Sequence, residues 1–313
     1  MKNMWKSGIM GVIVGDALGT PVQFETRAQV ATHPVKGMIG YGTFNLPEGT
    51  WTDDSSLTLA LLESISRMKS IRLHDIANNF VQWLEDGKFT PYGFSFDIGR
   101  GTMLAIRQYE MTHDVNTCGG RHPSNNGNGS IMRIMPAVLY CIENGYDDKR
   151  AIETIHAVSA LTHAHARAEI ACGLYYFMAR AIVNGTGELI DLLQTGIKDG
   201  IAYYRQDGHF GTELVNYTRL FELPSLKRMS DGAIKSSGYV VDTLEAAVWG
   251  LITTNSFDKA LLKIVNLGGD TDSIAAVAGG LAGLFYGCDA IPADWLKVIQ
   301  RREWIEELIG TME

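Results

Sequence analysis

The sequence predicts an all-α protein, and three observations support this fold class. Apolar residues recur at spacings of three and four along most of the chain, as they do on one face of an α-helix. We find no convincing stretch that alternates between apolar and polar residues as a half-buried strand would. The chain has 313 residues, of which 46% are hydrophobic and 20% charged, an ordinary composition for a globular protein with a large core. Because no Pro/Ser-rich linker or regular repeat divides the chain, we expect one compact domain over residues 1–313.

The first predicted helix covers residues 4–18 and ends in Gly15-Asp16-Ala17-Leu18-Gly19. A loop with several glycines and prolines continues to Thr50, and a second helix follows Thr52-Asp53-Asp54, because apolar residues then recur at helical spacing. Residues 111–130 and 223–238 are predicted to be irregular. Further helices are predicted over residues 74–84, 102–109, 131–142, 149–160, 164–183, 187–204, 213–222, 241–254, 257–265, 274–286 and 293–309. The helix over 274–286 is rich in Gly and Ala, so we expect it near the centre, where neighbouring helices approach closely.

Charge and cysteine content argue against several classes of protein. The net charge is -8 and no basic patch is present, which argues against binding nucleic acid through phosphate contacts. The four cysteines are widely spaced and form no C-x-x-C motif, as is typical of reduced thiols in a cytosolic protein. Lys2 and Lys6 precede an apolar run that resembles a signal peptide, but the run ends at Asp16 without a cleavage site. Residues 274–286 are too short and too Gly-rich to span a bilayer. We expect a cytoplasmic monomer without a membrane partner.

Two clusters of acids and hydroxyls stand before helices near opposite ends of the chain. Gly268-Gly269-Asp270-Thr271-Asp272-Ser273 precedes the helix over 274–286, and Thr52-Asp53-Asp54 precedes the second helix. Converging carboxylate and hydroxyl oxygens suit a hard divalent cation, Mg²⁺ or Mn²⁺, better than zinc. N-capping, with acids favoured by the helix dipole, explains each cluster taken alone. Four carboxylates brought together would repel each other without a cation, so N-capping and a dinuclear metal site both remain open.

Two further polar segments precede predicted helices. Asn125-Asn126-Gly127-Asn128-Gly129-Ser130 offers small residues and free amides that can hold a phosphate, although a flexible loop with a Ser cap explains it equally. The segment lacks the Gly-Lys-Ser/Thr ending of a Walker A motif. His163 and His165 have no third ligand at a suitable spacing, so a hydrogen bond at the helix start is favoured over a zinc site. Only the presence of the residue types supports Cys/His or Ser-His-Asp catalysis.

Taken in order, these motifs resemble those of the ADP-ribosylglycohydrolase family, which includes the dinitrogenase-reductase-activating glycohydrolase and the ADP-ribosyl-acceptor hydrolases. Each motif is weak alone, but the ordered set is specific and spans residues 8–287. The motifs are Gly15-Asp16-Ala17-Leu18-Gly19, Gly49-Thr50-Trp51-Thr52-Asp53-Asp54-Ser55, Asp97-Ile98-Gly99, Gly127-Asn128-Gly129-Ser130-Ile131-Met132-Arg133, Leu161-Thr162-His163 and Gly268-Gly269-Asp270-Thr271-Asp272-Ser273.

The resemblance implies an all-α fold around two Mg²⁺ or Mn²⁺ ions and a hydrolase that cleaves the glycosidic bond between ADP-ribose and an acceptor. It implies that Glu25 is an acid reaching the scissile ribose and that Asp97 is an acid close to the metals. The implied metal ligands are Thr52, Asp53, Asp54, Asp270, Asp272 and Ser273. The residues implied to bind substrate are Gly127, Asn128, Gly129 and Ser130 at the diphosphate and His163 at the ADP-ribose. The partner would be an ADP-ribosylated protein or a small ADP-ribose conjugate, and the sequence does not identify the acceptor.

Other functional classes make different demands on the sequence. A terpenoid-synthase-like enzyme would place an acid near residue 57 or 58, where Leu57 and Thr58 stand. A phosphatase with a D-x-D nucleophile would carry that motif after a strand near the N-terminus. A non-catalytic ADP-ribose-binding protein would not need both acid clusters and Glu25, and a turnover assay distinguishes it. A hydrolase of free ADP-ribose derivatives is a further alternative.

Overall fold

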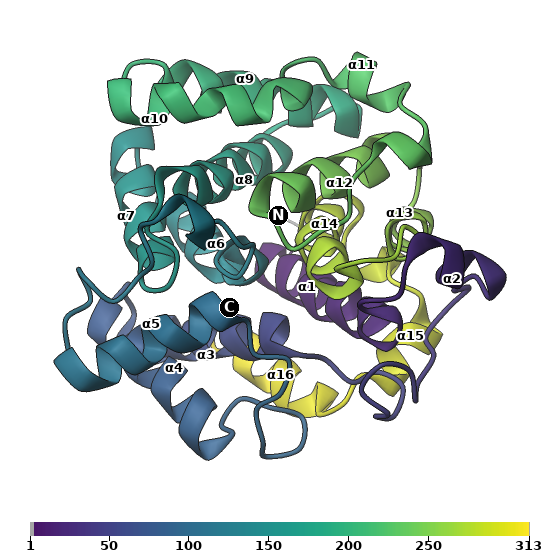
Figure 1. Ribbon diagram of the computed structural model, residues 1–313, viewed down its shortest axis with the longest axis horizontal. Helices are drawn as coiled ribbons and strands as arrows, with labels where there is room; N and C mark the ends of the chain where they lie inside the picture. Colours follow the sequence, from purple (N-terminus) through teal and green to yellow (C-terminus); the bar gives the residue numbers. More distant parts are fainter. Residues whose placement is uncertain (1–2, 313) are drawn as a thin grey trace.

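Two helices pack backbone against backbone at the centre of the molecule. The computed structural model describes residues 3–312, and in it α1 (Met4–Gly19) lies against α14 (Thr271–Tyr286) (Figure 1). A Cβ atom at Gly11 would overlap the carbonyl of Gly279, and one at Gly15 would overlap the carbonyl of Ala275. Glycines four residues apart therefore remove the side chains from this face of α1, and the two backbones touch. The predicted central, glycine-rich helix is confirmed.

The other helices surround this pair. α3 and α6 pack on α1, α12 and α13 pack on α14, α4 packs on α3, and α9 packs on α8. In Figure 1 the blue helices α3 to α5 lie below the pair, and α8 to α12 lie above it. The bounds are α3 Asp53–Met68, α4 Leu73–Asp86, α5 Arg100–Thr112, α6 Met135–Glu143, α7 Asp148–Ala160, α8 Ala166–Asn184, α9 Leu189–Tyr204, α12 Val240–Ile252 and α13 Phe257–Val265. The shorter helices are α2 Arg27–Thr32, α10 Gly208–Glu213, α11 Leu223–Lys227, α15 Ala293–Val298 and α16 Arg302–Gly310.

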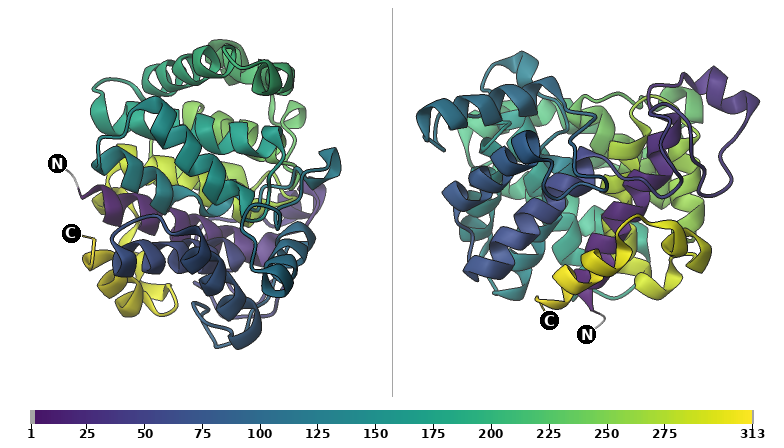
Figure 2. Two further views of the ribbon diagram at one scale, coloured as in Figure 1. Left: turned by 90° about the vertical axis from the view of Figure 1, so that its left-hand side faces the viewer. Right: turned by 90° about the horizontal axis from the view of Figure 1, so that it is seen from below.

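The all-α prediction is confirmed for residues 3–312, which contain no β-strand. Two isolated bridges, Gly120 to His163 and Gly127 to Tyr239, are the extended pairings in this part of the chain. The buried apolar residues form one cluster that reaches from Trp5 to Ile309. α16 returns to pack on α1, so the start of α1 and the end of α16 lie on the same side of the molecule (Figure 2). Within the described residues, no helix combines the length and apolar character needed to cross a bilayer.

Several predicted element boundaries are wrong. The predicted helix over 131–142 is a 3₁₀ turn at Ile131–Arg133 followed by α6, which has a proline in its first turn, where its missing N–H is tolerated. The predicted helix over 293–309 is broken into α15 and α16, because Arg301 adopts a left-handed conformation with φ 55°. Most of the predicted helix over 213–222 is a 3₁₀ helix. Two short helices, α2 and α11, lie in segments predicted to be irregular.

Candidate active site

Three chain segments bring acidic side chains together at one end of the α1–α14 pair. Asp16 lies in the last turn of α1, and Asp270 occupies the N-cap position of α14. Asp53 and Asp54 stand in the first turn of α3, directly after its N-cap residue Thr52. Both helix N-termini carry partial positive charge, which stabilises acids placed beside them. Asp270 makes no side-chain capping hydrogen bond, so capping does not explain its position.

The Gly268-Gly269 turn fixes the direction of Asp270. Both glycines have positive φ, 68° and 80°, and a Cβ at Gly268 would lie 2.6 Å from the carbonyl oxygen of Glu25. Gly269 donates a hydrogen bond to that carbonyl (2.7 Å) and accepts one from the backbone N–H of Phe24 (2.7 Å). The backbone N–H of Asp270 then donates to the carbonyl of Ser236 (2.9 Å). Only glycine fits this tight, left-handed turn between two other segments.

Asp16 anchors the N-terminus of α3, a role that the sequence analysis did not assign. Its carboxylate is fully buried and accepts hydrogen bonds from the backbone N–H groups of Thr52 (3.0 Å) and Ser55 (2.9 Å). The hydroxyls of Thr20, Thr52 and Ser55 donate to it as well. Burial raises the pKa of Asp16 to about 6, although these hydrogen bonds oppose the shift. An acid inside an apolar helix, flanked by Gly15 and Gly19, was the sequence signal for this role.

The two predicted clusters meet in space. The hydroxyl of Thr52 lies 3.2 Å from a carboxylate oxygen of Asp54 and 3.5 Å from one of Asp272. The hydroxyl of Ser273 lies 3.3 Å from the same oxygen of Asp54. The backbone N–H of Gly99 lies beside Asp53 and opposes the rise in its pKa. The structure therefore joins the N-termini of α3 and α14 through carboxylate and hydroxyl oxygens.

The cluster holds concentrated negative charge. Burial is the first cause that raises the pKa values of Asp53, Asp54 and Asp272 well above their usual range. The second cause is the charge of neighbouring carboxylates: Asp97 acts most on Asp53, Asp16 on Asp54, and Asp54 on Asp272. The charge of these groups in the folded protein is therefore unfavourable unless a cation neutralises it.

The donor set fits a hard divalent cation. Among the described residues, Oδ1 of Asp54 and Oδ1 of Asp272 are buried without a hydrogen-bond partner, so each has free lone pairs. No three His, Cys, Asp or Glu side chains among the described residues are arranged so that they alone could hold a metal ion. The set that fits here is mixed, because Thr52 and Ser273 contribute hydroxyl oxygens among the carboxylates. Such an all-oxygen set is typical of Mg²⁺ or Mn²⁺.

The structure places Gln23, which the sequence analysis passed over, between two of these acids. The side-chain nitrogen of Gln23 donates to Asp97 (2.8 Å) and lies 3.5 Å from an oxygen of Asp270. Asn128 donates to the other oxygen of Asp270 (2.5 Å). Burial raises the pKa of Asp97, and the hydrogen bond from Gln23 opposes this. Glu25 lies farther out, and among residues 3–312 its carboxylate has no hydrogen-bond or ion-pair partner.

Most of the predicted diphosphate loop lies at the site. Gly127, Asn128 and Gly129 line the same cavity as Asp53, Asp97 and Asp270, and so does His163. Ser130 is fully buried instead, and its hydroxyl accepts a hydrogen bond from the thiol of Cys172 (3.5 Å). The loop thus offers its backbone and the side chain of Asn128 to the cavity, and the hydroxyl of Ser130 faces the core.

A buried hydrogen-bond chain fixes the orientation and the proton position of His163. Arg133 is fully buried and donates to the carbonyl of Gly129 and to the hydroxyl of Thr162 (2.8 Å). The same hydroxyl lies 2.8 Å from Nδ1 of His163. Because the hydroxyl accepts from Arg133, its own proton is free to point to Nδ1, which leaves the ring proton on Nε2. Burial and the charge of Arg133 lower the pKa of His163 to about 3, so the ring is neutral.

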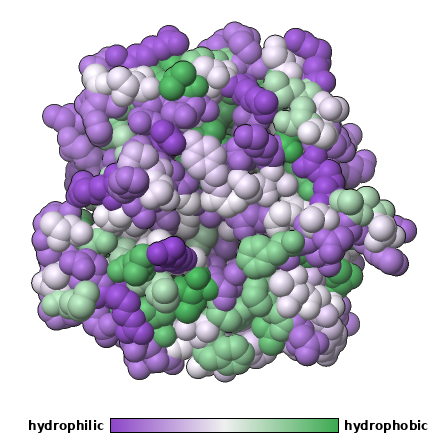
Figure 3. Space-filling view, in the orientation of Figure 1, coloured by the Kyte–Doolittle hydropathy of each residue, from purple (hydrophilic) through white to green (hydrophobic). Residues whose placement is uncertain are grey.

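The cavity that Asp53, Asp97, Asp270 and His163 line has a volume of about 290 Å³. Thr52, Asp54 and Asp272 are buried and are not among its lining residues. A larger cavity of about 700 Å³ adjoins it, shares Phe24, Gly238 and Asp270 with it, and is lined by Glu25. Phe24 is 64% exposed, and Figure 3 shows further apolar residues gathered over the lower half of this view. The pair of cavities thus combines an acidic floor, a Gly-rich wall and a partly apolar surface.

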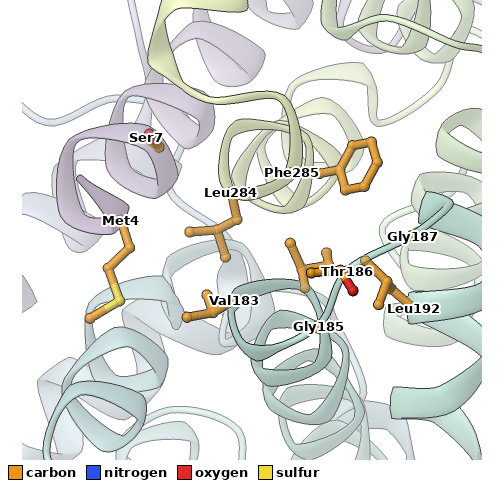
Figure 4. A pocket seen from close by; sticks show the side chains of 10 residues that line it. Met4, Ser7, Val183, Gly185, Thr186, Gly187, Leu192, Leu284 and Phe285 are labelled. Carbon is orange, nitrogen blue, oxygen red and sulfur yellow. The ribbon is translucent and has the colours of Figure 1, made fainter. Parts of the chain in front are cut away.

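Another crevice lies at the opposite end of the α1–α14 pair (Figure 4). It is lined by residues such as Met4, Val183, Leu192, Leu284 and Phe285. None of its lining side chains is ionisable, so it offers no group for acid–base chemistry. The acidic cavity, where Asp53, Asp97 and Asp270 converge, is the candidate active site.

Comparison with known proteins identifies the family of the chain. The family ADP-ribosylglycohydrolase matches residues 4–312. The chain is 30% identical to the ADP-ribosylarginine hydrolase Tri1 of Serratia proteamaculans (strain 568), over 97% of this chain and 77% of that protein. It is 30% identical to the ADP-ribosyl-[dinitrogen reductase] glycohydrolase of Rhodospirillum rubrum, over 94% of this chain and 89% of that protein. A solved ADP-ribosylglycohydrolase-related protein complex shares the fold, with a TM-score of 0.74 and 28% identity over 99% of this chain and 97% of that one. The chain belongs to the ADP-ribosylglycohydrolase family.

Proposed function

We propose that this protein hydrolyses the glycosidic bond between ADP-ribose and an arginine side chain, and so reverses ADP-ribosylation. Family membership supports hydrolysis of an ADP-ribose conjugate, and the relatives named as ADP-ribosylarginine hydrolases, 30% and 31% identical to this chain, favour arginine as the acceptor. The observation that carries the proposal is the meeting of Asp53, Asp97 and Asp270 with the Gly127–Gly129 loop and His163 around one cavity.

The cluster is proposed to hold two divalent cations, Mg²⁺ or Mn²⁺. Their ligands would be Thr52, Asp53, Asp54, Asp270, Asp272 and Ser273. Bound cations would neutralise the carboxylates, orient the hydroxyls of the ribose and make water more acidic. The unpartnered oxygens of Asp54 and Asp272 support this assignment.

The Gly-rich loop and His163 are proposed to bind the ADP-ribose. Gly127 and Gly129 place backbone groups at the cavity, and a neutral His163 presents its Nε2–H there. A neutral imidazole donates a single hydrogen bond to an oxygen of the ligand without adding a charge. Binding through His163 would therefore be independent of pH over the range where the ring stays neutral.

Two acids are candidates for proton transfer. Asp97 lines the smaller cavity with a raised pKa, so it is suited to take a proton from water beside the ribose. Glu25 lines the adjoining, larger cavity, which we assign to the acceptor. In this arrangement Glu25 protonates the leaving nitrogen, and Asp97 accepts the proton of the attacking water.

A panel of defined substrates tests the proposal. Purified protein would be offered ADP-ribosylarginine protein, ADP-ribosylserine protein and O-acetyl-ADP-ribose, and released ADP-ribose would be quantified by chromatography. Release from the arginine conjugate at the highest kcat/KM supports the proposal. Release from the small conjugate alone supports a hydrolase of free ADP-ribose derivatives, and ADP-ribose binding without any turnover supports a non-catalytic binding protein.

A further inference from the structure

Gln23 carries a buried hydrogen-bond acceptor that no protein group satisfies. The residue follows the 3₁₀ turn Thr20–Val22, is 3% exposed and lines the cavity of the candidate active site. Within residues 3–312, its side-chain oxygen Oε1 has no hydrogen-bond partner. Leaving a buried amide oxygen unpaired costs free energy, so such a group indicates a partner that the protein alone does not supply.

The orientation of the Gln23 amide is determined by its neighbours. Nε2 faces Asp97 at 2.8 Å and Asp270 at 3.5 Å, and ionised carboxylates only accept hydrogen bonds. A flipped amide would set Oε1 against the same two carboxylates and repel both. Nε2 therefore stays on the acids, and Oε1 points away from them.

The backbone holds this side chain in place. The carbonyl oxygen of Gln23 accepts a hydrogen bond from the hydroxyl of Thr43 (2.6 Å), and the backbone N–H of Gln23 donates to the carbonyl of Thr20 (3.4 Å). The next residue, Phe24, adopts φ 68° and donates to Gly269, which ties the segment to the turn before Asp270. Gln23 is thus fixed at the cavity before any ligand arrives.

We propose that Gln23 is a positioning residue for the attacking water of the proposed hydrolysis. Oε1 accepts a hydrogen bond from one O–H of the water, which directs a lone pair of the water oxygen at the anomeric carbon. A primary amide does not take up a proton near neutral pH, so Gln23 orients the water and does not act as the base. This inference rests on the proposed function.

The atoms of this step balance. The water oxygen forms a bond to the anomeric carbon of the ribose as the bond from that carbon to the guanidine nitrogen breaks. The nitrogen keeps the electron pair of the broken bond and takes a proton from Glu25. One water proton passes to the base of the proposed function, and the other stays on the new hydroxyl of ADP-ribose, still directed at Oε1 of Gln23.

The test compares the effect of a Gln23 substitution on turnover with its effect on ADP-ribose binding. Gln23→Leu and Gln23→Met remove both polar atoms of the side chain at similar size, and two variants guard against the failure of one to fold. We expect kcat to fall about 30- to 100-fold, as loss of orientation predicts, with KM and the Kd for ADP-ribose within about threefold of wild type. The matched control is Gln206→Leu, at an exposed position after α9 whose side chain contacts only a backbone carbonyl; it should keep wild-type values.

A second readout is specific to water positioning. Methanol has a single O–H, and its proton goes to the base, so attack by methanol does not use Oε1 of Gln23. In methanol–water mixtures, the ratio of O-methyl-ADP-ribose to ADP-ribose should therefore rise in the Gln23 variants. A ratio that stays at the wild-type value, or a loss of ADP-ribose affinity equal to the loss in kcat/KM, would contradict the assignment. An inactive wild type counts against the proposed function; an active wild type with equally active Gln23 variants counts against this inference.

Discussion

Replacing Thr162 with valine tests the hydrogen-bond chain behind His163. The hydroxyl of Thr162 lies 2.8 Å from Arg133 and 2.8 Å from Nδ1 of His163, and Thr162 is 1% exposed. Valine has nearly the same shape but no hydroxyl. Thr162→Val therefore leaves a buried guanidinium N–H and a buried ring nitrogen without a partner.

The expected loss of stability follows from those two groups. A hydrogen bond to a charged group contributes about 1.5–3 kcal/mol, so we expect the free energy of unfolding to fall by about 3 kcal/mol. For a chain of 313 residues this corresponds to a decrease in Tm of about 5 °C. Without the hydroxyl, the ring proton can move from Nε2 to Nδ1. We expect ADP-ribose to bind about tenfold more weakly, which corresponds to about 1.4 kcal/mol.

Three measurements check this prediction. Thermal melts report the stability, isothermal calorimetry reports the Kd for ADP-ribose, and ¹⁵N NMR reports which nitrogen of His163 carries the proton. Thr162→Ser is the matched control, since it keeps the hydroxyl and should retain the wild-type tautomer and affinity. A valine variant with the Nε2–H tautomer and wild-type affinity would refute the reasoning.

Three further predictions concern acids and protons at the site. The pKa of His163 is lowered to about 3, so below pH 6.5 the unfolded chain binds a proton that the folded chain does not, and stability falls as the pH falls. Between pH 7 and pH 5, the free energy of unfolding, measured with urea, should fall by about 2 kcal/mol more in wild type than in His163→Gln. An equal fall in the two proteins would argue against a neutral, buried ring. Glu25→Gln and Asp97→Asn should each lower kcat strongly and leave ADP-ribose affinity within about tenfold; an acid whose variant turns over normally has no role in proton transfer. In chelator, Asp270→Asn should melt at or above the wild-type Tm, because one repelling charge is gone, and should gain little from Mg²⁺; equal metal-induced shifts in the two proteins would reject a shared site.

Helix periodicity was sufficient to predict the fold class, whereas the meeting of the two acid clusters was implied by the family resemblance. The apolar pattern after Thr52 and the Gly- and Ala-rich pattern after Ser273 each predicted a helix, and α3 and α14 start at those clusters. Their convergence depends on α1, whose Asp16 anchors the start of α3 and whose glycines let its backbone touch that of α14. The helix signal was local and regular, so it was visible in a single sequence.

Side-chain direction in the loops was not predictable in the same way. Gln23 and Glu25 stand two residues apart in one turn, and nothing in their types shows which of them faces the acids. The answer depends on the positive φ of Phe24 and on its hydrogen bond to Gly269, which is almost 250 residues away in the chain. Ser130 is similar, because its contact with Cys172 depends on how α8 packs under the loop.

The dependence of hydrolysis on divalent cations tests the central claim, that the clusters before α3 and α14 form one catalytic cation site. ADP-ribose release from ADP-ribosylarginine protein would be measured after chelation, with metal content verified by elemental analysis, and again after adding Mg²⁺ or Mn²⁺. The account predicts no turnover in chelator and full recovery with either or both cations. Full activity of the metal-free protein would contradict it.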